Sequence, residues 1–281
     1  MELENNLRIL KLYPSFDVKY PSFLGKNYNY HVNYGVWDKI AGDKILLENI
    51  NVDLSKYDVV FLPMVKRWET SPTLRKFVNK LKNSNIKTVL FDNDSCYRSF
   101  NQNVYDNIDL ILYRDLDKNK NKPNTSSMWH PWSIDTSLYT PIYGNNTISL
   151  NCSVSSHYPL RKQISKIIKH TNHKGKEYIK CLQNSAASIH TDSPLVPMVR
   201  AKALEIAACG AQIISNRTEK MDYFFPDDLI LYFDNIEDFK NLISNYTPNI
   251  ETQKKLRQIV ESKHDNKVRA KEIIDKIKEI L

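Results

Sequence analysis

The sequence is poor in the residues that mark dinucleotide-binding, metal-binding and disulfide-rich proteins. It has only six glycines, and none of them forms the G-x-G-x-x-G pattern in which a glycine-rich turn approaches a pyrophosphate. This disfavours a dinucleotide enzyme such as a sugar-nucleotide epimerase. The four cysteines (Cys96, Cys152, Cys181 and Cys209) are far apart and show no C-x-x-C spacing. That spacing argues against a zinc site and against a disulfide framework, and we expect Cys209 to be a small buried residue in a helix.

Long hydrophobic runs are also missing. The longest apolar runs, such as Val59–Val65, are far shorter than the roughly 20 residues that a membrane-spanning helix needs. The first residues, MELENNLRILKLYPS, place acidic residues before a short apolar run, which is not the pattern of a signal peptide. We therefore expect a cytoplasmic protein without a transmembrane segment.

Positive charge is in excess, with 40 Lys and Arg against 32 Asp and Glu. A net charge of +8 favours anionic partners such as nucleotide phosphates, nucleic acid or an anionic membrane surface. The basic residues are spread along the chain except in Arg161–Lys180, where seven Lys and Arg accompany one Glu. That window is either a solvated helix face or part of a binding site. The high content of Asn, Lys and Ile is typical of an AT-rich viral or low-GC bacterial genome.

Apolar strands alternate with a helix in the first half of the chain. Continuous apolar runs at 8–13, 57–63, 87–91 and 108–113 predict strands of the kind that are buried in a parallel sheet. The spacing of Leu74, Phe77, Val78 and Leu81 predicts a helix with one buried face over 72–81.

The same alternation restarts after residue 146. We expect strands at 147–154, 186–190, 212–215 and 229–232, and helices at 160–170, 178–184, 199–209 and 236–246, with one or two more over 254–281. Gly210 is placed to end the helix over 199–209. The pattern predicts an α/β fold of two Rossmann-like lobes, 1–143 and 144–281, with the terminal helix packing back on the first lobe. Ligands of such lobes sit beyond the carboxyl ends of the strands, here expected in a cleft between the lobes.

The most informative segment is Ser188–Arg217, which is predicted to be strand, loop, helix, glycine stop and strand. Its loop, Asp192–Pro197, includes Ser193 and leads into a helix N-terminus, where free N–H groups and the helix dipole favour a phosphate. Arg200 and Lys202 would add positive charge. Glu205, one turn on, would accept hydrogen bonds from a ribose diol, or else be an exposed helix residue.

Within this segment, K-A-L-E-I-A-A-C-G-A-Q-I-I resembles the (K/R)-x-x-E-x-x-A-x-G-x-x-(V/I)-I block of GT-B glycosyltransferases. The likeness continues in register over roughly residues 147–277. The further matching segments are His157–Arg161 (Y-x-x-R), Tyr178–Ser188 (Y-x-x-x-L-x-x-S), Phe225–Glu237 and His264–Ile274. The set is most similar to the glycosyltransferases related to spore-maturation proteins. The first lobe matches only as a generic Rossmann half.

The resemblance implies a nucleotide-sugar donor, such as a UDP- or GDP-sugar, in the C-terminal lobe and an acceptor in the N-terminal lobe. It implies that Glu205 binds the donor ribose and that Arg161 and Lys202 face the diphosphate, with no tightly bound cofactor or divalent metal ion. The family leans towards retention of configuration at the sugar. However, the second Glu that many relatives carry is Pro197 here, and a Gly-Gly loop is replaced by Tyr13–Tyr34.

Asp94 is the preferred catalytic candidate, because the turn Asp92–Ser95 follows a buried strand at its carboxyl end. A carboxylate there would act as a base or orient an acceptor hydroxyl, and its alternative role is to cap the following helix. Some phage DNA glucosyltransferases of this fold carry an H-D pair at the equivalent turn. Asn93-Asp94 resembles this pair at its second residue, Asp94.

Histidines and aromatic residues supply the remaining candidates. His190 ends the strand before the donor loop and would reach a sugar or phosphate, whereas His130 is expected to pack at the crossover between the lobes. His31 and Tyr34 are candidate acceptor contacts. Tyr28, Tyr30, Tyr34 and Trp37 would stack on a sugar or base or else pack the loop onto its lobe.

These observations predict a glycosyltransferase acting on a glycan hydroxyl, or on a modified DNA base. The alternative is a binding protein without catalysis, for a nucleotide-sugar or for nucleic acid. A nucleic-acid reader should show a continuous basic face with interleaved aromatics. The basic window lies instead in the predicted donor lobe, which weakens that alternative.

Overall fold

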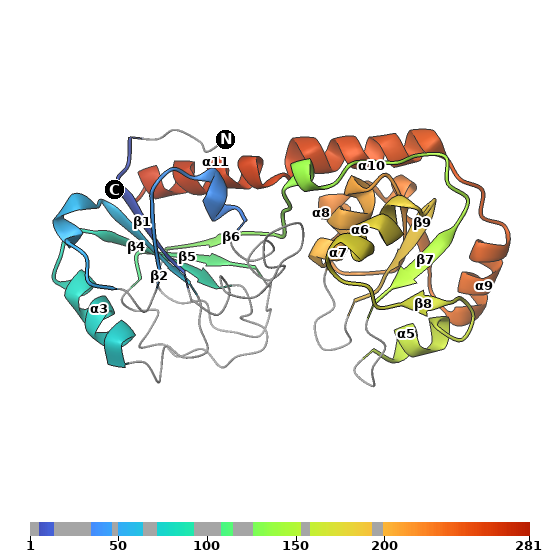
Figure 1. Ribbon diagram of the computed structural model, residues 1–281, viewed down its shortest axis with the longest axis horizontal. Helices are drawn as coiled ribbons and strands as arrows, with labels where there is room; N and C mark the ends of the chain where they lie inside the picture. Colours follow the sequence, from blue (N-terminus) through green and yellow to red (C-terminus); the bar gives the residue numbers. More distant parts are fainter. Residues whose placement is uncertain are drawn as a thin grey trace. The chain divides into compact units, whose positions relative to one another are not determined.

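The fold is known from a computed structural model of the chain, which describes residues 6–13, 35–46, 50–63, 72–92, 108–114, 126–152, 158–192 and 199–281. Contacts divide the chain into two compact units. Unit 1 comprises Met1–Pro21, Asn29–Pro131 and Arg269–Leu281, and unit 2 comprises Ser22–Tyr28 and Trp132–Val268. Each unit is built on one parallel sheet with helices beside it (Figure 1).

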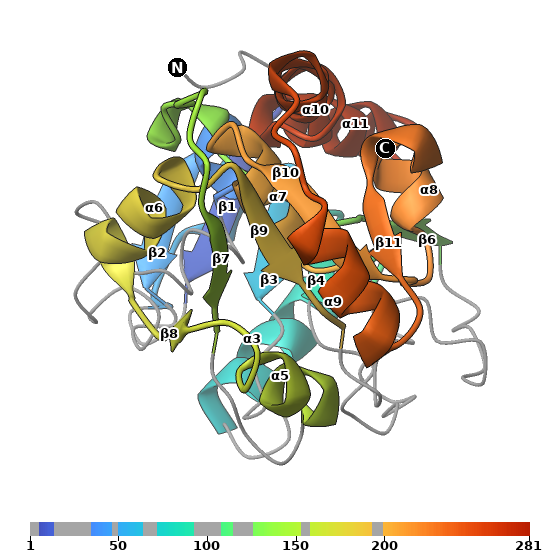
Figure 2. The same cartoon turned by 90° about the vertical axis from the view of Figure 1, so that its right-hand side faces the viewer.

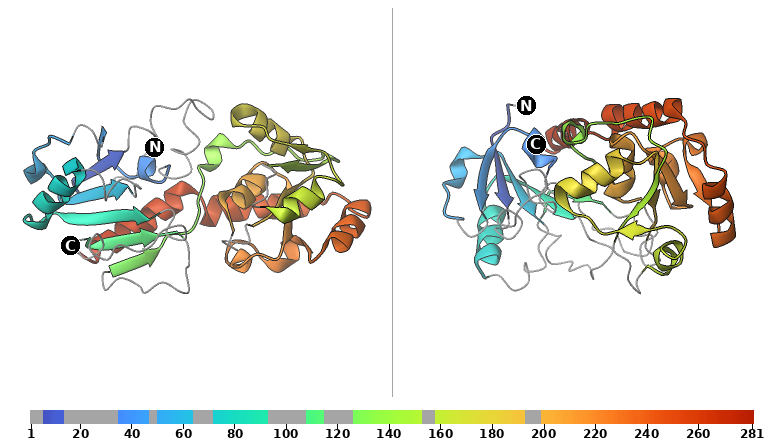
Figure 3. Two further views of the ribbon diagram at one scale, coloured as in Figure 1. Left: turned by 90° about the horizontal axis from the view of Figure 1, so that it is seen from below. Right: turned by 45° about the vertical axis from the view of Figure 1, so that its right-hand side comes forward.

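Unit 1 has a six-stranded sheet in the order β2-β1-β3-β4-β5-β6, with every neighbouring pair parallel. Its strands are β1 (Ile9–Tyr13), β2 (Asp43–Leu46), β3 (Val59–Pro63), β4 (Lys87–Asp92), β5 (Leu110–Tyr113) and β6 (Ser126–Trp129). Its helices are α3 (Pro72–Lys82), most of α11 (Asn266–Lys278) and the short 3-10 turns η1 (Trp37–Lys39) and η3 (Leu54–Lys56). Figure 3 shows the strands of this sheet side by side.

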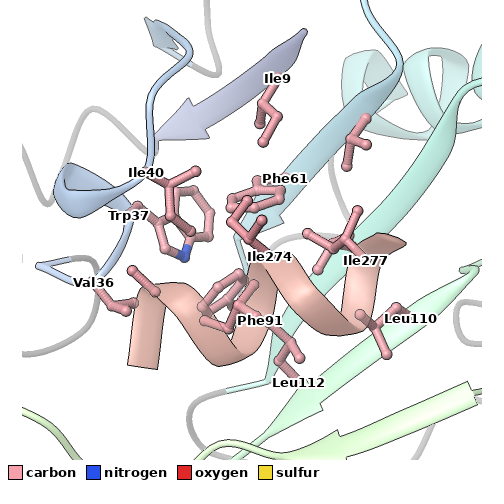
Figure 4. Close-up of a cluster of buried hydrophobic side chains, with 14 of the residues drawn as sticks. Ile9, Val36, Trp37, Ile40, Phe61, Phe91, Leu110, Leu112, Ile274 and Ile277 are labelled. Atoms are coloured by element: carbon pink, nitrogen blue, oxygen red, sulfur yellow. The ribbon is translucent and has the colours of Figure 1, made fainter. Parts of the chain in front are cut away.

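Different helices cover the two faces of this sheet. Successive side chains of a strand point to opposite faces, so neighbouring residues of one strand pack against different helices. Phe61 and Phe91 lie in a cluster with Ile274 of α11, whereas Val60 and Leu90 pack with α3. Figure 4 shows the first cluster, in which Trp37 lies among Phe61, Phe91 and the isoleucines of α11. The apolar runs that predicted strands are therefore buried on both faces, as a parallel sheet requires.

A charged residue sits inside this apolar core. Lys11, in the middle of β1, is fully buried, and its Nζ donates hydrogen bonds to the carbonyl oxygens of Trp37 (3.0 Å) and Ile40 (2.5 Å). A buried ammonium is costly unless hydrogen bonds satisfy it. Lys11 thus fixes η1, and with it Trp37, against the sheet.

Unit 2 has a five-stranded parallel sheet in the order β11-β10-β9-β7-β8. Its strands are β7 (Ile148–Asn151), β8 (His170–Thr171), β9 (Ala187–His190), β10 (Gln212–Asn216) and β11 (Leu231–Phe233). Its helices are α5 (Pro159–Ile164), α6 (Gly175–Gln183), α7 (Ala201–Ala208), α8 (Met221–Phe224), α9 (Ile236–Ser244) and α10 (Ile250–Lys263), with η5 (Thr136–Leu138) and η6 (Asp227–Leu229) as 3-10 turns. Figure 2 shows this sheet with α9 against one face, where Phe239 packs on Ile189 and Ile214.

Residues 132–143 belong to unit 2 by their contacts, although the sequence pattern placed them with the first lobe. Ile134 forms a β-bridge with Asp265, and the Ile142 N–H donates to the carbonyl oxygen of Cys209 at 3.1 Å. The division of the chain therefore falls between Pro131 and Trp132. Hydrogen bonds to α7 and α10 decide this, and they are not visible in a local sequence pattern.

The α7 helix ends as the sequence predicted, at Gly210. Gly210 has φ of 83°, its N–H donates to Ala207, and the following Ala211 N–H donates to Ile206. These two bonds and a left-handed residue form a Schellman cap. An added Cβ at Gly210 would lie 3.0 Å from the carbonyl oxygen of Ile142, a tight contact, and the positive φ would strain any other side chain, so glycine is favoured there.

Several expected elements differ from the structure. The helix expected over 160–170 ends at Ile164, and Ile167 and Ile168 then pack against the core of unit 2 before the chain enters β8. The edge strands β2, β6 and β8 were not predicted. Their residues are exposed or half-buried, so they lack the continuous apolar run that marks a buried strand. In the part of the chain that the structure describes, no helix combines the length and the apolar character needed to span a bilayer.

Arg257 of α10 holds three backbone segments of unit 2 together. Its guanidinium donates to the carbonyl oxygens of Ala208 (2.6 Å), Tyr139 (2.8 Å) and Thr136 (3.2 Å). Hydrogen bonds from a charged donor contribute about 1.5–3 kcal/mol each, so we expect Arg257→Met to lower the free energy of unfolding by about 3 kcal/mol or more. Urea denaturation measures this change.

The matched control on the same helix is Lys254→Met, because Lys254 forms an exposed ion pair with Glu251 at 3.0 Å. Such pairs contribute about 0–1 kcal/mol. Equal losses in the two variants would contradict the role assigned to Arg257.

Candidate functional site

The strand order of unit 2 creates a switch point between β7 and β9. After β7 the chain forms β8 on one side of it, and it then returns to form β9 on the other side. In open parallel sheets, ligands bind outside the carboxyl ends of the strands at such a point. The residues at the ends of these two strands, Asn151 and His190, therefore mark the candidate site.

Arg161 of α5 is fixed against the end of β9. Its Nε donates to Thr191 Oγ1 at 2.6 Å, and Nη2 donates to the Thr191 carbonyl oxygen at 3.0 Å. The guanidinium also lies over the ring of Tyr158, 3.8 Å from its centroid. The structure thus places Arg161 at the switch point, and its contact with a donor diphosphate stays a prediction.

Lys202 joins the start of α7 to the end of β7. Its Nζ donates to the carbonyl oxygen of Asn151 at 2.6 Å. Burial lowers the pKa of Lys202 to about 8, and the nearby positive charge of Arg161 acts in the same direction. The ammonium is therefore poorly solvated and is close to a second cation.

His190 lies at the centre of these groups and is fully buried. Its Nδ1 lies 3.0 Å from Ser215 Oγ, and the backbone N–H of Arg200 donates to Nε2 at 3.4 Å. Because Nε2 accepts a hydrogen bond, the proton of a neutral ring sits on Nδ1 and is donated to Ser215. Burial lowers the pKa of His190 to about 3, and repulsion by Lys202, Arg161 and Arg200 adds to the effect.

The carboxylate of Asp192 lies near two of these cations. Asp192 accepts a hydrogen bond from Asn216 Nδ2 at 2.8 Å, and burial raises its pKa. Arg161 and Arg200 lie near enough to oppose that rise.

The described groups at the switch point combine three cationic side chains with the N-terminus of α7. Helix N-termini carry N–H groups without intrahelical partners and a partial positive charge. Together with Arg161, Arg200 and Lys202, this arrangement can bind an anion with more than one charge, such as a diphosphate. The positive charge of this arrangement disfavours the binding of a cation. Within the described residues, no group of three or more His, Cys, Asp or Glu could hold a metal ion.

Glu205 is fully buried, so its alternative interpretation as an exposed helix residue is wrong. Its Oε1 accepts a hydrogen bond from the Tyr139 hydroxyl at 3.1 Å, and Oε2 accepts one from the Tyr178 hydroxyl at 2.5 Å. The carboxylate lies one turn along α7 from Lys202. A pentose can contact it only if the groups that cover it move aside, and its ribose contact stays a prediction.

Four predicted site residues lie outside the described residues and stay predictions: Asp94, Ser193, His31 and Tyr34. The structure describes Asp92, two residues before Asp94, as the buried last residue of β4. For the candidate residues of unit 1, the structure describes only the preceding strands, which are β1 before His31 and Tyr34 and β4 before Asp94.

Three other residues pack in the interior. Trp37 is buried and makes an edge contact with Phe91, with ring centroids 4.6 Å apart. His130 is buried, with its ring edge-on to Phe91 at 5.5 Å. Cys209 is also buried. The packing roles expected for His130 and Cys209 are confirmed, and for Trp37 the packing alternative holds.

The basic window at residues 161–180 mostly faces outward. Its lysines are exposed, and Lys180 pairs with Glu177 at 2.9 Å. Arg161 is the member that turns towards the switch point, through its bonds to Thr191.

Sequence reasoning missed the partners of the charged residues. Asn151 and Thr191 hold Lys202 and Arg161 through backbone or hydroxyl oxygens, which no motif reveals. Tyr178 stood in a matching motif without an assigned role, and Tyr139 stood outside every motif. A polar residue at the carboxyl end of a buried strand was the available signal for Asn151.

Comparison with known proteins gives one family match. A family described as glycosyl transferase-like matches residues 134–275, which is half of the chain. No curated protein matches the sequence.

Solved structures match over nearly the whole chain. Sucrose-phosphate synthase from Thermosynechococcus elongatus has a TM-score of 0.63 at 9% identity, covering 98% of this chain and 99% of that one. HepE from Anabaena, in complex with UDP, has a TM-score of 0.59 at 10% identity, covering 97% of this chain and 100% of that one. The β-glucosyltransferase of phage T4 has a TM-score of 0.59 at 9% identity, covering 98% and 99%. At such identities the likeness shows the fold alone, which is the GT-B arrangement of two parallel-sheet α/β units.

The buried neutral His190 predicts acid sensitivity. Below pH 6.5 the unfolded chain binds a proton at this imidazole, whereas the folded chain does not until about pH 3. Acid therefore favours unfolding, by up to about 1.4 kcal/mol per pH unit for one group. His190→Gln removes this titration, so we expect the stability advantage of the wild type to shrink by about 1.6 kcal/mol between pH 6.5 and 5.

Urea denaturation at several pH values measures the effect. The exposed His173 provides the control for loss of an imidazole, and His173→Gln is measured in parallel. A constant difference between the wild type and His190→Gln across this range would show that His190 does not stay neutral.

Proposed function

The chain belongs to the glycosyl transferase-like family, and we propose that it transfers a sugar from a nucleotide-sugar donor to an acceptor hydroxyl. The observation that carries this proposal is the group of Arg161, Arg200 and Lys202 around the start of α7 at the switch point of unit 2. All three residues lie within the segment that the family matches.

We propose that the donor diphosphate binds at this point. Its charges would be met by the guanidinium of Arg161, the ammonium of Lys202 and the N–H groups that begin α7. Ser193 and His190 would line the same site, His190 by holding the first turn of α7 in place through its bond to the Arg200 N–H.

A uridine diphosphate sugar is the donor that we favour, with a GDP-sugar as the alternative. HepE from Anabaena was solved with UDP and with UDP-glucose, and the phage T4 β-glucosyltransferase was solved with UDP-glucose. These proteins share the fold of this chain at 9–10% identity, so they support the donor class but not the sugar. Glu205 would bind the ribose of the nucleotide.

The acceptor would be held by unit 1, where Asp94, His31 and Tyr34 are the proposed contacts. The acceptor oxygen forms a bond to the anomeric carbon as the bond from that carbon to the phosphate oxygen breaks. The hydroxyl proton passes to Asp94 or to the departing phosphate oxygen. Arg161, Lys202 and the α7 N-terminus stabilise the negative charge that develops on the diphosphate, so catalysis would rest on positioning and electrostatics.

The subfamily and the stereochemistry of transfer rest on the sequence motifs. The blocks after residue 147 place the chain nearest to the glycosyltransferases related to spore-maturation proteins, and that relationship favours retention of anomeric configuration. A hexosyl or a pentosyl group would suit the site equally. The acceptor would be a glycan hydroxyl, or a hydroxyl on a modified nucleic-acid base.

The donor site is tested with a panel of UDP- and GDP-sugars, using thermal stabilisation for binding and release of free sugar for turnover. We expect stabilisation and slow donor hydrolysis with at least one of them. Glu205→Ala should lose nucleotide protection, and Glu205→Gln, which keeps the side-chain volume, controls for damage to the fold. Full donor affinity in both variants would show that Glu205 does not bind the donor.

The lowered pKa of Lys202 predicts that nucleotide binding depends on pH. Its pKa of about 8 means that the free protein loses this charge as the pH rises above 8, whereas a bound diphosphate favours the charged form. We therefore expect UDP affinity to be constant near pH 7 and to fall by up to tenfold per pH unit above about pH 8.

Titration calorimetry between pH 7 and 9 measures this dependence. Lys202→Arg should flatten it, because a guanidinium stays charged over the whole range. Lys240→Arg, at an exposed residue of α9 paired with Glu237, is the control and should keep the wild-type profile. The same decline in wild type and Lys202→Arg would exclude Lys202 as its source.

A further inference from the structure

A run of exposed basic side chains follows the edge of the unit 2 sheet that β8 forms. Residues 162–180 contain six lysines against one glutamate, so this short stretch supplies five of the eight net positive charges of the chain. All six lysines are exposed, and so are both histidines of the stretch. We call these residues the basic edge: Lys162, Lys166, Lys169, His170, His173, Lys174, Lys176 and Lys180.

The fold brings the basic edge to one side of unit 2. The elements α5, β8 and α6 follow one another in the chain, and β8 is the outer strand beside β7. Thr171 of β8 also contacts α6, because its Oγ1 lies 3.7 Å from Cys181 Sγ. Figure 2 shows α6, β8 and α5 along this side of the sheet.

The lysines of the basic edge differ in pairing from those of the C-terminal helices. On α9, α10 and α11, Lys240, Lys254 and Lys276 each form an ion pair with a glutamate three residues away. On the basic edge, Lys180 pairs with Glu177 at 2.9 Å, and the other five lysines form no ion pair with any residue that the structure describes. Their charges therefore add to a positive potential that attracts an anionic partner.

Protection of the sheet edge does not account for these lysines. Charged side chains on an edge strand do prevent it from pairing with another chain. However, β8 consists only of His170 and Thr171, so it presents few free N–H and C=O groups. The lysines lie on the helices and turns beside it.

The exposed side chains of the basic edge are all polar. The structure describes every residue from 162 to 180, and no apolar side chain among them is exposed. Ile164 and its neighbours Ile167 and Ile168 pack with the core of unit 2. A helix that lies on a bilayer inserts Trp, Phe or Leu among its lysines, so this surface does not suit a membrane. Tyr178 is buried, which leaves no exposed tyrosine on which the bases of a single strand would stack.

The cations of the basic edge suit phosphates better than bases. The stretch 162–180 contains no arginine, the residue whose fork binds a guanine edge in two places. A lysine acts on a phosphate as a point charge, and a nucleic-acid duplex carries one negative charge about every 1.7 Å along its axis. Contacts to phosphates hold a protein on a duplex but carry no sequence information.

We propose that the basic edge binds the phosphate backbone of a nucleic-acid duplex without reading its sequence. This surface lies outside the proposed donor site, and its binding holds whether or not the chain transfers a sugar. It needs no interleaved aromatic residues, which belong to proteins that bind bases. If the acceptor is a modified DNA base, such a surface would also concentrate the acceptor at the enzyme.

The test measures binding of short fluorescent DNA and RNA duplexes of mixed sequence by anisotropy, without any nucleotide-sugar. We expect dissociation constants on the order of 1–100 μM near physiological salt, equal for two unrelated sequences. Affinity should fall steeply between about 50 and 200 mM NaCl, because binding releases counterions from the duplex.

The diagnostic variant carries Lys166→Gln, Lys169→Gln, Lys174→Gln and Lys176→Gln together. We expect it to bind the duplexes about tenfold or more weakly. The slope of log affinity against log salt should fall by about one for each lysine that contacts a phosphate. Melting temperature reports whether the variant remains folded.

The matched control removes the same charge from other exposed lysines of unit 2. It carries Lys240→Gln, Lys254→Gln, Lys255→Gln and Lys263→Gln on α9 and α10. It should keep the salt slope of the wild type. Equal weakening in the two variants would show that total charge drives binding, and it would overturn the proposal.

Two further outcomes would also overturn it. One is failure of the wild type to bind either duplex at about 50 mM NaCl. The other is tighter binding, at equal phosphate concentration, to a single strand or to vesicles that contain phosphatidylserine. None of these results affects the donor site, which the nucleotide-sugar panel tests separately.

Discussion

The arrangement of the unit 2 site depends on the imidazole of His190 being neutral. In that state the ring accepts the N–H of Arg200 at the start of α7 and donates to Ser215 of the neighbouring strand, so one side chain joins β9, β10 and α7. A protonated ring would lose its acceptor nitrogen and would add a fourth positive charge beside Arg161, Arg200 and Lys202. Burial and these cations keep the proton off, and the cations stay together at one edge of the sheet.

Without a bound anion, the clustering of three positive charges at the carboxyl ends of these strands is unfavourable. Like charges repel, and Lys202 has a pKa well below that of a free lysine because it is buried beside Arg161. Two of the cations are held at strand ends, Arg161 by Thr191 and Lys202 by the carbonyl oxygen of Asn151. A bound anion such as the proposed diphosphate would relieve this repulsion.

The fold survives at very low sequence identity because its requirements are generic. Solved GT-B structures match at 9–10% identity over almost the entire chain. In unit 1 the requirement is a sheet with apolar side chains on both faces, one packed on α3 and the other on α11. Many combinations of Val, Ile, Leu and Phe satisfy it. The family match, in contrast, covers 134–275, the segment that contains Arg161, Arg200 and Lys202.

The order of residues alone determined the α/β class, the buried strands and the end of α7 at Gly210. These features follow from local rules: apolar runs make buried strands, and only glycine readily adopts the left-handed residue of the helix cap. Arg161, His190, Lys202 and Glu205 could also be named, because motifs preserve the spacing of charged groups. Tertiary structure decided what these residues touch. Asn151, Thr191, Tyr139 and Tyr178 come from segments tens of residues away, and the half-buried edge strands carry no apolar signal, so their partners and pairings depend on how the chain returns to the sheet.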